Sequence, residues 1–306
     1  MHLKGKIIEL PSNFTNSSMF NFFSKFIDEE TLDPLYNKIY FQLDTLKFIK
    51  PTGVTAFANT CELLLSRGCN VSFSYDPNMT YSKKCPICYL DDSGFFETYS
   101  NHKIHKYSSC RATTLPLKKI HNNEWFAWVE NTVVPWIDSK LNCNIKDQFP
   151  ELKTCFWEIC NNIIDHSGEN IANSFIQYYP HDSGGRIEIA ISDFGVGIPY
   201  NVAKACSFET HAEAIEIAIR DGFSTKSSHT NRGAGLGILI DNVVLNNQGI
   251  VQIFSYRGEA SFLYNKGKKR HIARNIFFYP GTLIKITINT DTILQAKDNN
   301  SEKFEW

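Results

Sequence analysis

The chain has 306 residues, 42% of them hydrophobic, and its 31 Lys and Arg residues nearly balance 32 Asp and Glu residues. This length predicts two domains with apolar cores, and the balanced charge gives no general attraction to nucleic acid or to an anionic membrane. No apolar run reaches the roughly 18 residues of a membrane-spanning helix, so we expect neither a membrane span nor a signal peptide. The nine cysteines, an odd number without a disulfide-scaffold spacing, favour free thiols and a cytoplasmic protein.

The N-terminal third alternates between strand and helix patterns. Residues 5–10 and 38–43 are typical of strands, and residues 16–28 are typical of a helix. From residue 51, apolar residues recur at helical spacing for about four turns, and residues 71–75 resume as a strand. We therefore expect a βαβ unit in this part of the chain.

The stretch from Phe41 to Gly53 resembles the STAS domain, the small α/β module of anti-sigma-factor antagonists and sulfate transporters. The resemblance implies a STAS-like domain over residues 1–105. Some members of that family carry a phosphorylated Ser or Thr just before the glycine that opens the helix, where this chain has Thr52. A threonine between Pro51 and Gly53 can also cap the helix through its hydroxyl. We favour this capping role over phosphorylation.

Cys85 and Cys88 are spaced as zinc ligands often are, with His102, His105 and Cys110 downstream. The second CxxC or HxxxH pair that usually completes such a site is missing. We therefore favour burial of the two cysteines in a short helix as small apolar residues.

Residues 106–150 are expected to form a helical bridge between two domains. Residues 124–141 carry an aromatic-rich helical pattern that Pro135 interrupts, and such a stripe predicts packing. His121 lacks the acidic neighbour and the helical context of a phosphorylated histidine, so we reject that role.

Residues 151–166 carry apolar residues at i, i+3 and i+4 spacing, which predicts a helix packed on a sheet. Glu158, Asn162 and Asp165 fall on another face of that helix. Their spacing places the three side chains in one column, so they can converge on one ligand.

Residues 174–179 and 186–192 predict a hairpin whose second strand ends at Asp193. Gly195 and Gly197 follow, and glycine lets the backbone pass closely around a ligand because it has no Cβ. An ordinary Asp-Gly turn is the alternative interpretation.

Residues 211–220 and 236–247 predict helices, and strands are expected near 250–256, 272–279 and 282–289. The second helix follows a glycine-rich stretch, Gly-Ala-Gly-Leu-Gly at 233–237. Glycines before a helix leave backbone N–H groups free to bind phosphate, although no strand directly precedes them, so the dinucleotide-binding fingerprint does not fit.

In their order along the chain, the motifs at 158–162, 193–197 and 233–237 are similar to the sequence boxes of the ATP-binding domain shared by gyrase, Hsp90, histidine kinases and MutL, the GHKL family. The resemblance implies a GHKL domain over residues 151–292, a two-layer α/β sandwich of the histidine-kinase-like ATPase (Bergerat) type, with ATP between a mixed sheet and a mobile lid. It also implies that Asn162 coordinates Mg²⁺, that Glu158 is the general base, and that Asp193 accepts a hydrogen bond from the adenine amino group. The remaining residues expected at the nucleotide are Asp165, Gly195, Gly197, Ile198, Thr225, Lys226, Gly233, Ala234, Gly235, Leu236, Gly237 and Thr282.

The predicted function is that of an Mg²⁺-ATP-binding GHKL ATPase, a nucleotide-dependent conformational switch in a bacterial regulatory or defence system. A STAS-like module stands where sensor kinases have a dimerising hairpin, and residues 293–306 form a polar tail where other members continue into a transducer domain. One alternative is a serine/threonine kinase of the anti-sigma type that phosphorylates a STAS-domain partner. Another is a non-catalytic ATP-binding subunit. The protein partner is unidentified, a homodimer is left open, and the basic run at 266–270 favours a solvated hairpin tip over a nucleic-acid contact.

Overall fold

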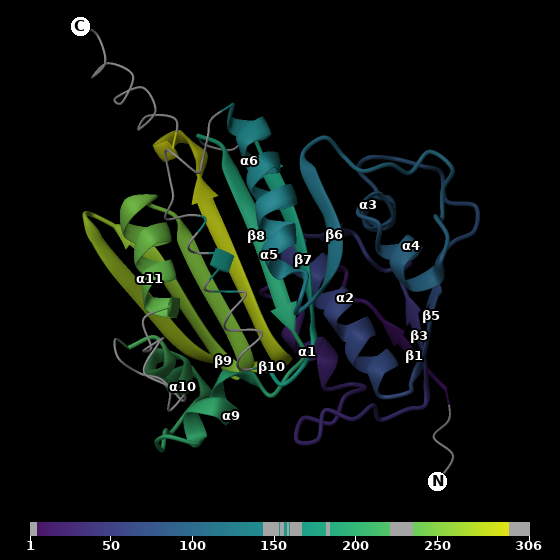
Figure 1. The fold of residues 1–306 in the computed structure, drawn as a ribbon. Helices are drawn as coiled ribbons and strands as arrows, with labels where there is room; N and C mark the ends of the chain where they lie inside the picture. The colour runs from purple at the N-terminus through teal and green to yellow at the C-terminus, as the bar shows by residue number, and fades with distance from the viewer. Residues whose placement is uncertain are drawn as a thin grey trace, which may run out of the picture.

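Two main β-sheets lie on either side of one buried helix, α2 (Pro51–Ser66), in the computed structural model of this chain (Figure 1). The structure describes residues 5–142, 153, 156–157, 159, 167–181, 184–220 and 235–293. The chain is thus a mixed α/β protein. We call the elements from β1 to α4 the N-terminal module, and the elements from β6 to β10 the C-terminal module.

The N-terminal module is built on three parallel strands in the order β1-β3-β5, namely β1 (Lys6–Glu9), β3 (Lys38–Gln42) and β5 (Asn70–Ser74). A second, two-stranded parallel pair joins β2 (Asn13–Phe14) to β4 (Phe48–Ile49), and the short helices α3 (Pro86–Asp92) and α4 (Phe95–Ser100) follow β5. The predicted βαβ unit is confirmed, because β3 and β5 are parallel and α2 connects them.

The predicted helix at 16–28 is wrong in length, because only α1 (Phe20–Phe23) is helical. The adjacent residues Phe22 and Phe23 are both fully buried, which one face of a surface helix cannot achieve. Phe22 contacts the ring of Phe41 in β3, whereas Phe23 contacts the ring of Tyr279 in the other sheet. Packing on two sides therefore overrides the helical pattern.

Thr52 does not cap α2, so that expectation is also wrong. The N-cap position is Lys50, Pro51 opens the first turn, and Thr52 lies inside the helix. Its side chain is 1% exposed, and its hydroxyl has no hydrogen-bond partner among the described residues. The helix begins there because proline is well suited to the first turn, where its missing N–H costs nothing.

The C-terminal module contains a five-stranded sheet in the order β6-β7-β8-β10-β9. Its strands are β6 (Thr114–His121), β7 (Ile171–Tyr179), β8 (Arg186–Asp193), β9 (Ile250–Asn265) and β10 (Lys268–Asn289). The predicted hairpin is confirmed as β7 and β8. All neighbouring pairs are antiparallel, so this sheet is not the mixed sheet that the resemblance implies.

The strands predicted at 272–279 and 282–289 are one long strand, β10, with an irregular register between Asn275 and Thr282. In the basic run at 266–270, Lys266 and Gly267 form the exposed turn between β9 and β10, both with positive φ, and the other three residues begin β10. That pattern is typical of a tight hairpin turn. The favoured interpretation of this run as a hairpin tip is therefore confirmed.

Helices cover one face of the five-stranded sheet (Figure 1). They comprise α5 (Trp125–Trp128), the π-helical turn η1 (Val129–Val133), α6 (Val134–Leu141), α11 (Gly235–Asp241) and the π-helical turn η2 (Asn242–Asn246). The segment predicted as a helical bridge thus contains an edge strand, β6, and helices that belong to the core of this module. The π-helical turn lies directly before Pro135, which has no N–H to continue an α-helical ladder.

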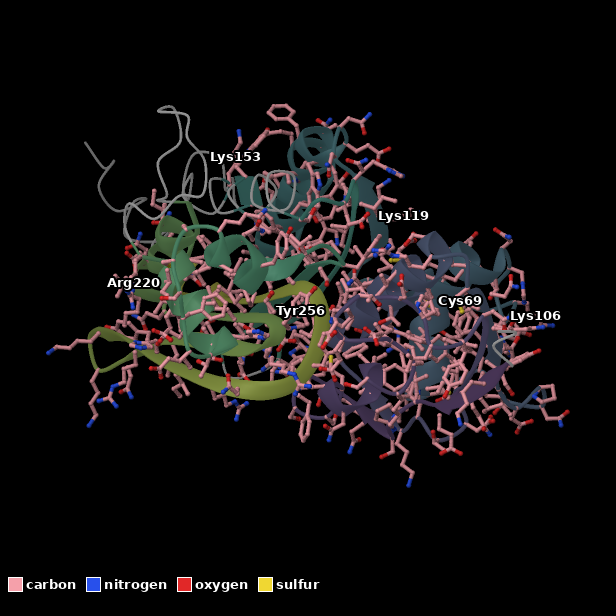
Figure 2. All side chains as sticks on the ribbon, turned by 90° about the horizontal axis from the view of Figure 1, so that it is seen from below. Cys69, Lys106, Lys119, Lys153, Arg220 and Tyr256 are labelled. Carbon is pink, nitrogen blue, oxygen red and sulfur yellow. The ribbon has the colours of Figure 1, made fainter. Side chains whose placement is uncertain are left out.

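The other face of the sheet is covered by the N-terminal module, so the sheet is buried on both sides. Along β8, Ile187, Ile189 and Ile191 pack in the core under the helices, whereas Ala190 belongs to the core shared with the N-terminal module. At one side of this interface Lys119 of β6 reaches Glu62 of α2, with 2.8 Å between Nζ and Oε2 (Figure 2). No helix among the described residues is long and apolar enough to cross a membrane.

Candidate functional site

Asp193 is the last residue of β8, in the middle of the five-stranded sheet, and it is 4% exposed. Its Oδ1 accepts a 2.9 Å hydrogen bond from the N–H of Gly195. Burial raises the pKa of this carboxyl to about 7, although the hydrogen bond from Gly195 favours the charged form. A buried carboxyl with a pKa shifted this far is a typical feature of a functional site.

The glycines after Asp193 are required by close packing. A Cβ on Gly195 would lie 1.9 Å from the carbonyl oxygen of Ser167, which also accepts the N–H of Val196 at 2.9 Å. Gly197 has φ of +73°, and a Cβ there would lie 2.7 Å from the ring of Tyr256. These two glycines therefore let the backbone pass close to Ser167 and Tyr256 of the same chain, and the predicted close approach to a ligand stays a prediction.

Thr282 lies opposite Asp193 in the β8–β10 ladder. Its hydroxyl is 3.2 Å from the Oγ of Ser255, which accepts the N–H of Ile198 at 3.0 Å and donates to the carbonyl oxygen of Gly281 at 2.9 Å. Three predicted site residues, Asp193, Ile198 and Thr282, are therefore brought together by the end of β8 and the bulged part of β10.

Ser255 is a residue of this site that the sequence did not indicate. It is fully buried and joins α9 (Gly197–Ala203), which follows the Asp193 loop, to β10. A serine inside an apolar strand has no sequence pattern that distinguishes it, because its role depends on two partners from other elements.

The glycine-rich stretch is described only in part. Gly235, Leu236 and Gly237 lie inside α11, so the described part of this helix already includes Gly235, and Leu236 packs against the core of the C-terminal module. Figure 1 shows α11 over β9 and β10, on the sheet face that the helices cover. The predicted residues Glu158, Asn162, Asp165, Thr225, Lys226, Gly233 and Ala234 lie outside the described residues.

Most of the predicted helix at 151–166 also lies outside the described residues. Lys153, Phe156, Trp157 and Ile159 are helical, and Phe156 and Ile159 are buried in the core between the helices and the sheet. The ammonium of Lys153 pairs with Glu130 at 2.7 Å, which ties this helix to η1.

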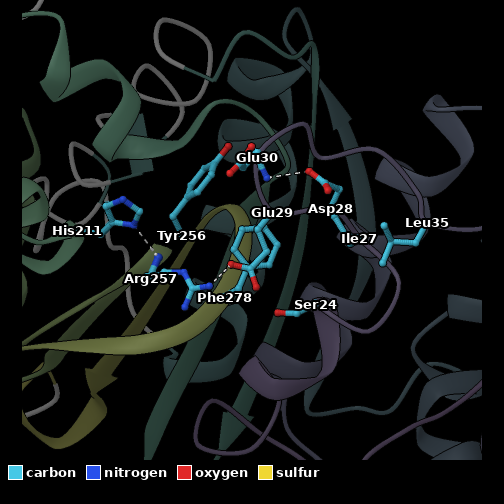
Figure 3. Close-up of a pocket in the computed structure, with 10 residues that line it drawn as sticks. All are labelled: Ser24, Ile27, Asp28, Glu29, Glu30, Leu35, His211, Tyr256, Arg257 and Phe278. Carbon is cyan, nitrogen blue, oxygen red and sulfur yellow. Dashed lines mark hydrogen bonds and ion pairs between the residues drawn. The ribbon is translucent and has the colours of Figure 1, made fainter.

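A cavity of about 520 Å³ lies between the two modules, beside Tyr256 (Figure 3). The guanidinium of Arg257 pairs there with Glu29. The backbone N–H of Arg257 donates to Nδ1 of His211, the first residue of α10 (His211–Ala218). Burial lowers the pKa of His211, and the neighbouring Arg257 charge lowers it further, so the ring is neutral at pH 7. Phe278 completes the aromatic wall. The sequence did not predict this cavity, because its walls come from distant parts of the chain.

No group of three His, Cys, Asp or Glu side chains among the described residues, Cys85 and Cys88 included, is placed to hold a metal ion. Cys88 is buried, and this burial raises the pKa of its thiol to about 11. Cys85 is half-buried against the sulfur of Met79. The favoured interpretation, packing in a short helix, is confirmed for Cys88 in α3, with Cys85 just before that helix.

No family model matches this chain, and no curated protein matches its sequence. A functional interpretation therefore depends on the residues themselves and on their arrangement around Asp193.

Proposed function

We propose that the chain is a GHKL-type protein that binds Mg²⁺-ATP and uses slow hydrolysis as a conformational switch. One observation supports this most: a buried carboxyl at a strand end, with glycine backbone packed closely around it. An acceptor with little access to water selects a donor such as the amino group of adenine, because an unmatched partner would leave it unpaired.

The layering of the two modules supports this proposal, although the sheet is antiparallel throughout and not mixed. A five-stranded sheet with helices on one face is the kind of layer that a GHKL domain supplies, and the parallel β3-α2-β5 unit is the kind of module that a STAS domain supplies. In this proposal the STAS-like module covers the sheet face opposite the nucleotide.

The catalytic part of the proposal concerns residues outside the described ranges. Asn162 would hold Mg²⁺, which neutralises phosphate charge when bound. Glu158 would orient a water molecule and take its proton. Asp165, Thr225, Lys226 and the glycine-rich stretch from Gly233 would line the phosphates.

Calorimetry with ATP, ADP and GTP, each with and without Mg²⁺, tests the proposal directly. We expect ATP and ADP to bind, GTP to bind much more weakly, and Mg²⁺ to strengthen the binding of ATP. Asp193→Asn should abolish binding. The N–H of Gly195 would continue to donate to the side-chain oxygen, so the new amide NH₂ would face the amino group of adenine, and two donors cannot form a hydrogen bond. Equal affinity for ATP and GTP in the wild type would refute adenine recognition.

A serine/threonine kinase is the second candidate, because a STAS-like α/β unit and the proposed nucleotide site occur in one chain. Thr52 at 1% exposure is inaccessible to a kinase in this fold, so the acceptor would be a partner's STAS domain. Incubation with γ-labelled ATP and a STAS-domain protein separates the two functions. Label on protein supports the kinase, whereas release of free phosphate alone supports the ATPase. Binding without either product supports the third candidate, a non-catalytic ATP-binding subunit.

A further inference from the structure

Two uncharged polar side chains of helix α2 contact strand β8 in the middle of the five-stranded sheet. Thr55 and Asn59, about one turn apart, are fully buried at this interface. The Thr55 hydroxyl is 3.5 Å from the carbonyl oxygen of Ala190, and the Asn59 amide donates a 2.9 Å hydrogen bond to the carbonyl oxygen of Asp193. Burial alone does not require an amide here, since leucine would bury more apolar surface. The hydrogen bond therefore specifies an orientation.

The Asp193 carbonyl is confined from a second direction by Gly281. Gly281 has φ of +83°, and a Cβ on it would lie 2.3 Å from the carbonyl oxygen of Asp193. The peptide after Asp193 thus lies between α2 and β10. Two residues later along the chain, the N–H of Gly195 donates to the Asp193 carboxylate. Any rotation of this peptide would move that donor and the carboxylate relative to each other.

The neighbouring residue strengthens the same arrangement. The Oγ of Ser192 donates to the carbonyl oxygen of Thr282 at 2.8 Å and lies 2.6 Å from the hydroxyl of Tyr279. The end of β8 is therefore tied to β10 on one side and to α2 on the other, and all of these groups are buried. A set of buried hydrogen bonds such as this one within an apolar interface favours one arrangement over its alternatives.

We propose that Asn59 is a positioning residue for the nucleotide site and that α2 couples the N-terminal module to base recognition. The inference rests on the proposed contact between Asp193 and the adenine amino group. Asn59 holds the Asp193 peptide, the peptide places the carboxylate, and the carboxylate selects the base. By linkage, a base that engages Asp193 stabilises the contact between α2 and β8.

The test compares the affinities of ATP and ITP, because inosine has an oxygen where adenine has the amino group. The ratio of the two affinities does not depend on the fraction of the protein that is folded, so it separates positioning from loss of structure. We expect Asn59→Leu to lower the ATP/ITP ratio about tenfold, the effect of misplacing one hydrogen bond. Thr55→Val is the matched control: it removes a hydroxyl from the same helix and interface, but its partner is Ala190, and the ratio should not change.

Asn59→Ala, which is smaller, replaces Asn59→Leu if the leucine variant does not fold. An unchanged ATP/ITP ratio in the Asn59 variant, with a clear ATP preference in the wild type, would overturn the positioning role and leave the proposed function intact. A wild type that binds neither nucleotide, or binds both equally, would overturn the proposed function and this inference with it. An equal loss of ratio in Thr55→Val would show that the whole interface, and not Asn59, sets the selectivity, and would also overturn the inference.

Discussion

Replacement of Asp193 by asparagine should make the ligand-free protein more stable at neutral and alkaline pH. The change keeps the shape of the side chain and the acceptor for the N–H of Gly195. It removes the ability to ionise in a buried position, and burial of the charge is the main reason that the pKa of Asp193 is raised from 3.8 to about 7.

The sign and the size of the change in unfolding free energy follow from the shift in the pKa of Asp193. Because the folded-state pKa is raised, the folded protein keeps this proton to a higher pH than the unfolded chain. The destabilising effect is therefore absent below about pH 4, grows between about pH 4 and pH 7, and is complete above about pH 7. A shift of about three units corresponds to about 4 kcal/mol of unfolding free energy.

Urea denaturation of the wild type and Asp193→Asn, without nucleotide, measures this effect. The variant should match the wild type near about pH 4 and exceed it by up to about 4 kcal/mol near about pH 8. Asp44→Asn, which removes an exposed carboxyl, controls for the loss of one negative charge. The reasoning fails if the stability difference between wild type and Asp193→Asn is the same at both pH values.

Three further changes test other parts of the structure. Gly195→Ala should destabilise the fold by at least about 3 kcal/mol in urea unfolding, because its Cβ meets the backbone oxygen of Ser167. The control, Gly267→Ala, introduces a Cβ at a positive φ but into open space, and should destabilise the fold by only about 1 kcal/mol. Equal losses of stability in the two variants would refute the packing argument. Thr52→Val should be neutral or stabilising by about 1 kcal/mol in the same assay, since its buried hydroxyl has no partner, so a large loss would reveal an essential role for the hydroxyl. Glu158→Ala should retain ATP binding by calorimetry and lose about 10²–10⁴ in phosphate release; unchanged turnover would remove Glu158 from catalysis.

The sequence predicted those parts of the fold that depend on local pattern. The strand that ends at Asp193 was recognisable from its period of two and from the turn residues before it, and helix α2 from its apolar spacing and Pro51. Gly195 and Gly197 were recognisable because a glycine pair after a strand indicates close backbone packing. The short helix containing Cys88 was also predicted correctly, because it too follows from the pattern of neighbouring residues.

The sequence predicted the wrong secondary structure where contacts between distant residues outweigh the local preference for helix or strand. The segment around Phe22 and Phe23 has a helical pattern but lies between two sheets, and aromatic packing on both sides limits the helix to four residues. Strand β6 was not recognised, because its place at the edge of the sheet depends on pairing with β7, about 50 residues later in the chain. Thr52 looked like a helix cap, but Pro51 already begins the first turn.

The sequence by itself determined that a carboxylate ends a strand and that glycines follow it. Only the tertiary structure decided what holds that carboxylate in place. The hydrogen bond from Asn59 to the Asp193 carbonyl joins residues 134 positions apart, and the contact between Ser255 and Thr282 depends on the pairing of two long strands. Such contacts have no local pattern, because they form only when the N-terminal module covers the second face of the sheet and removes both faces from water.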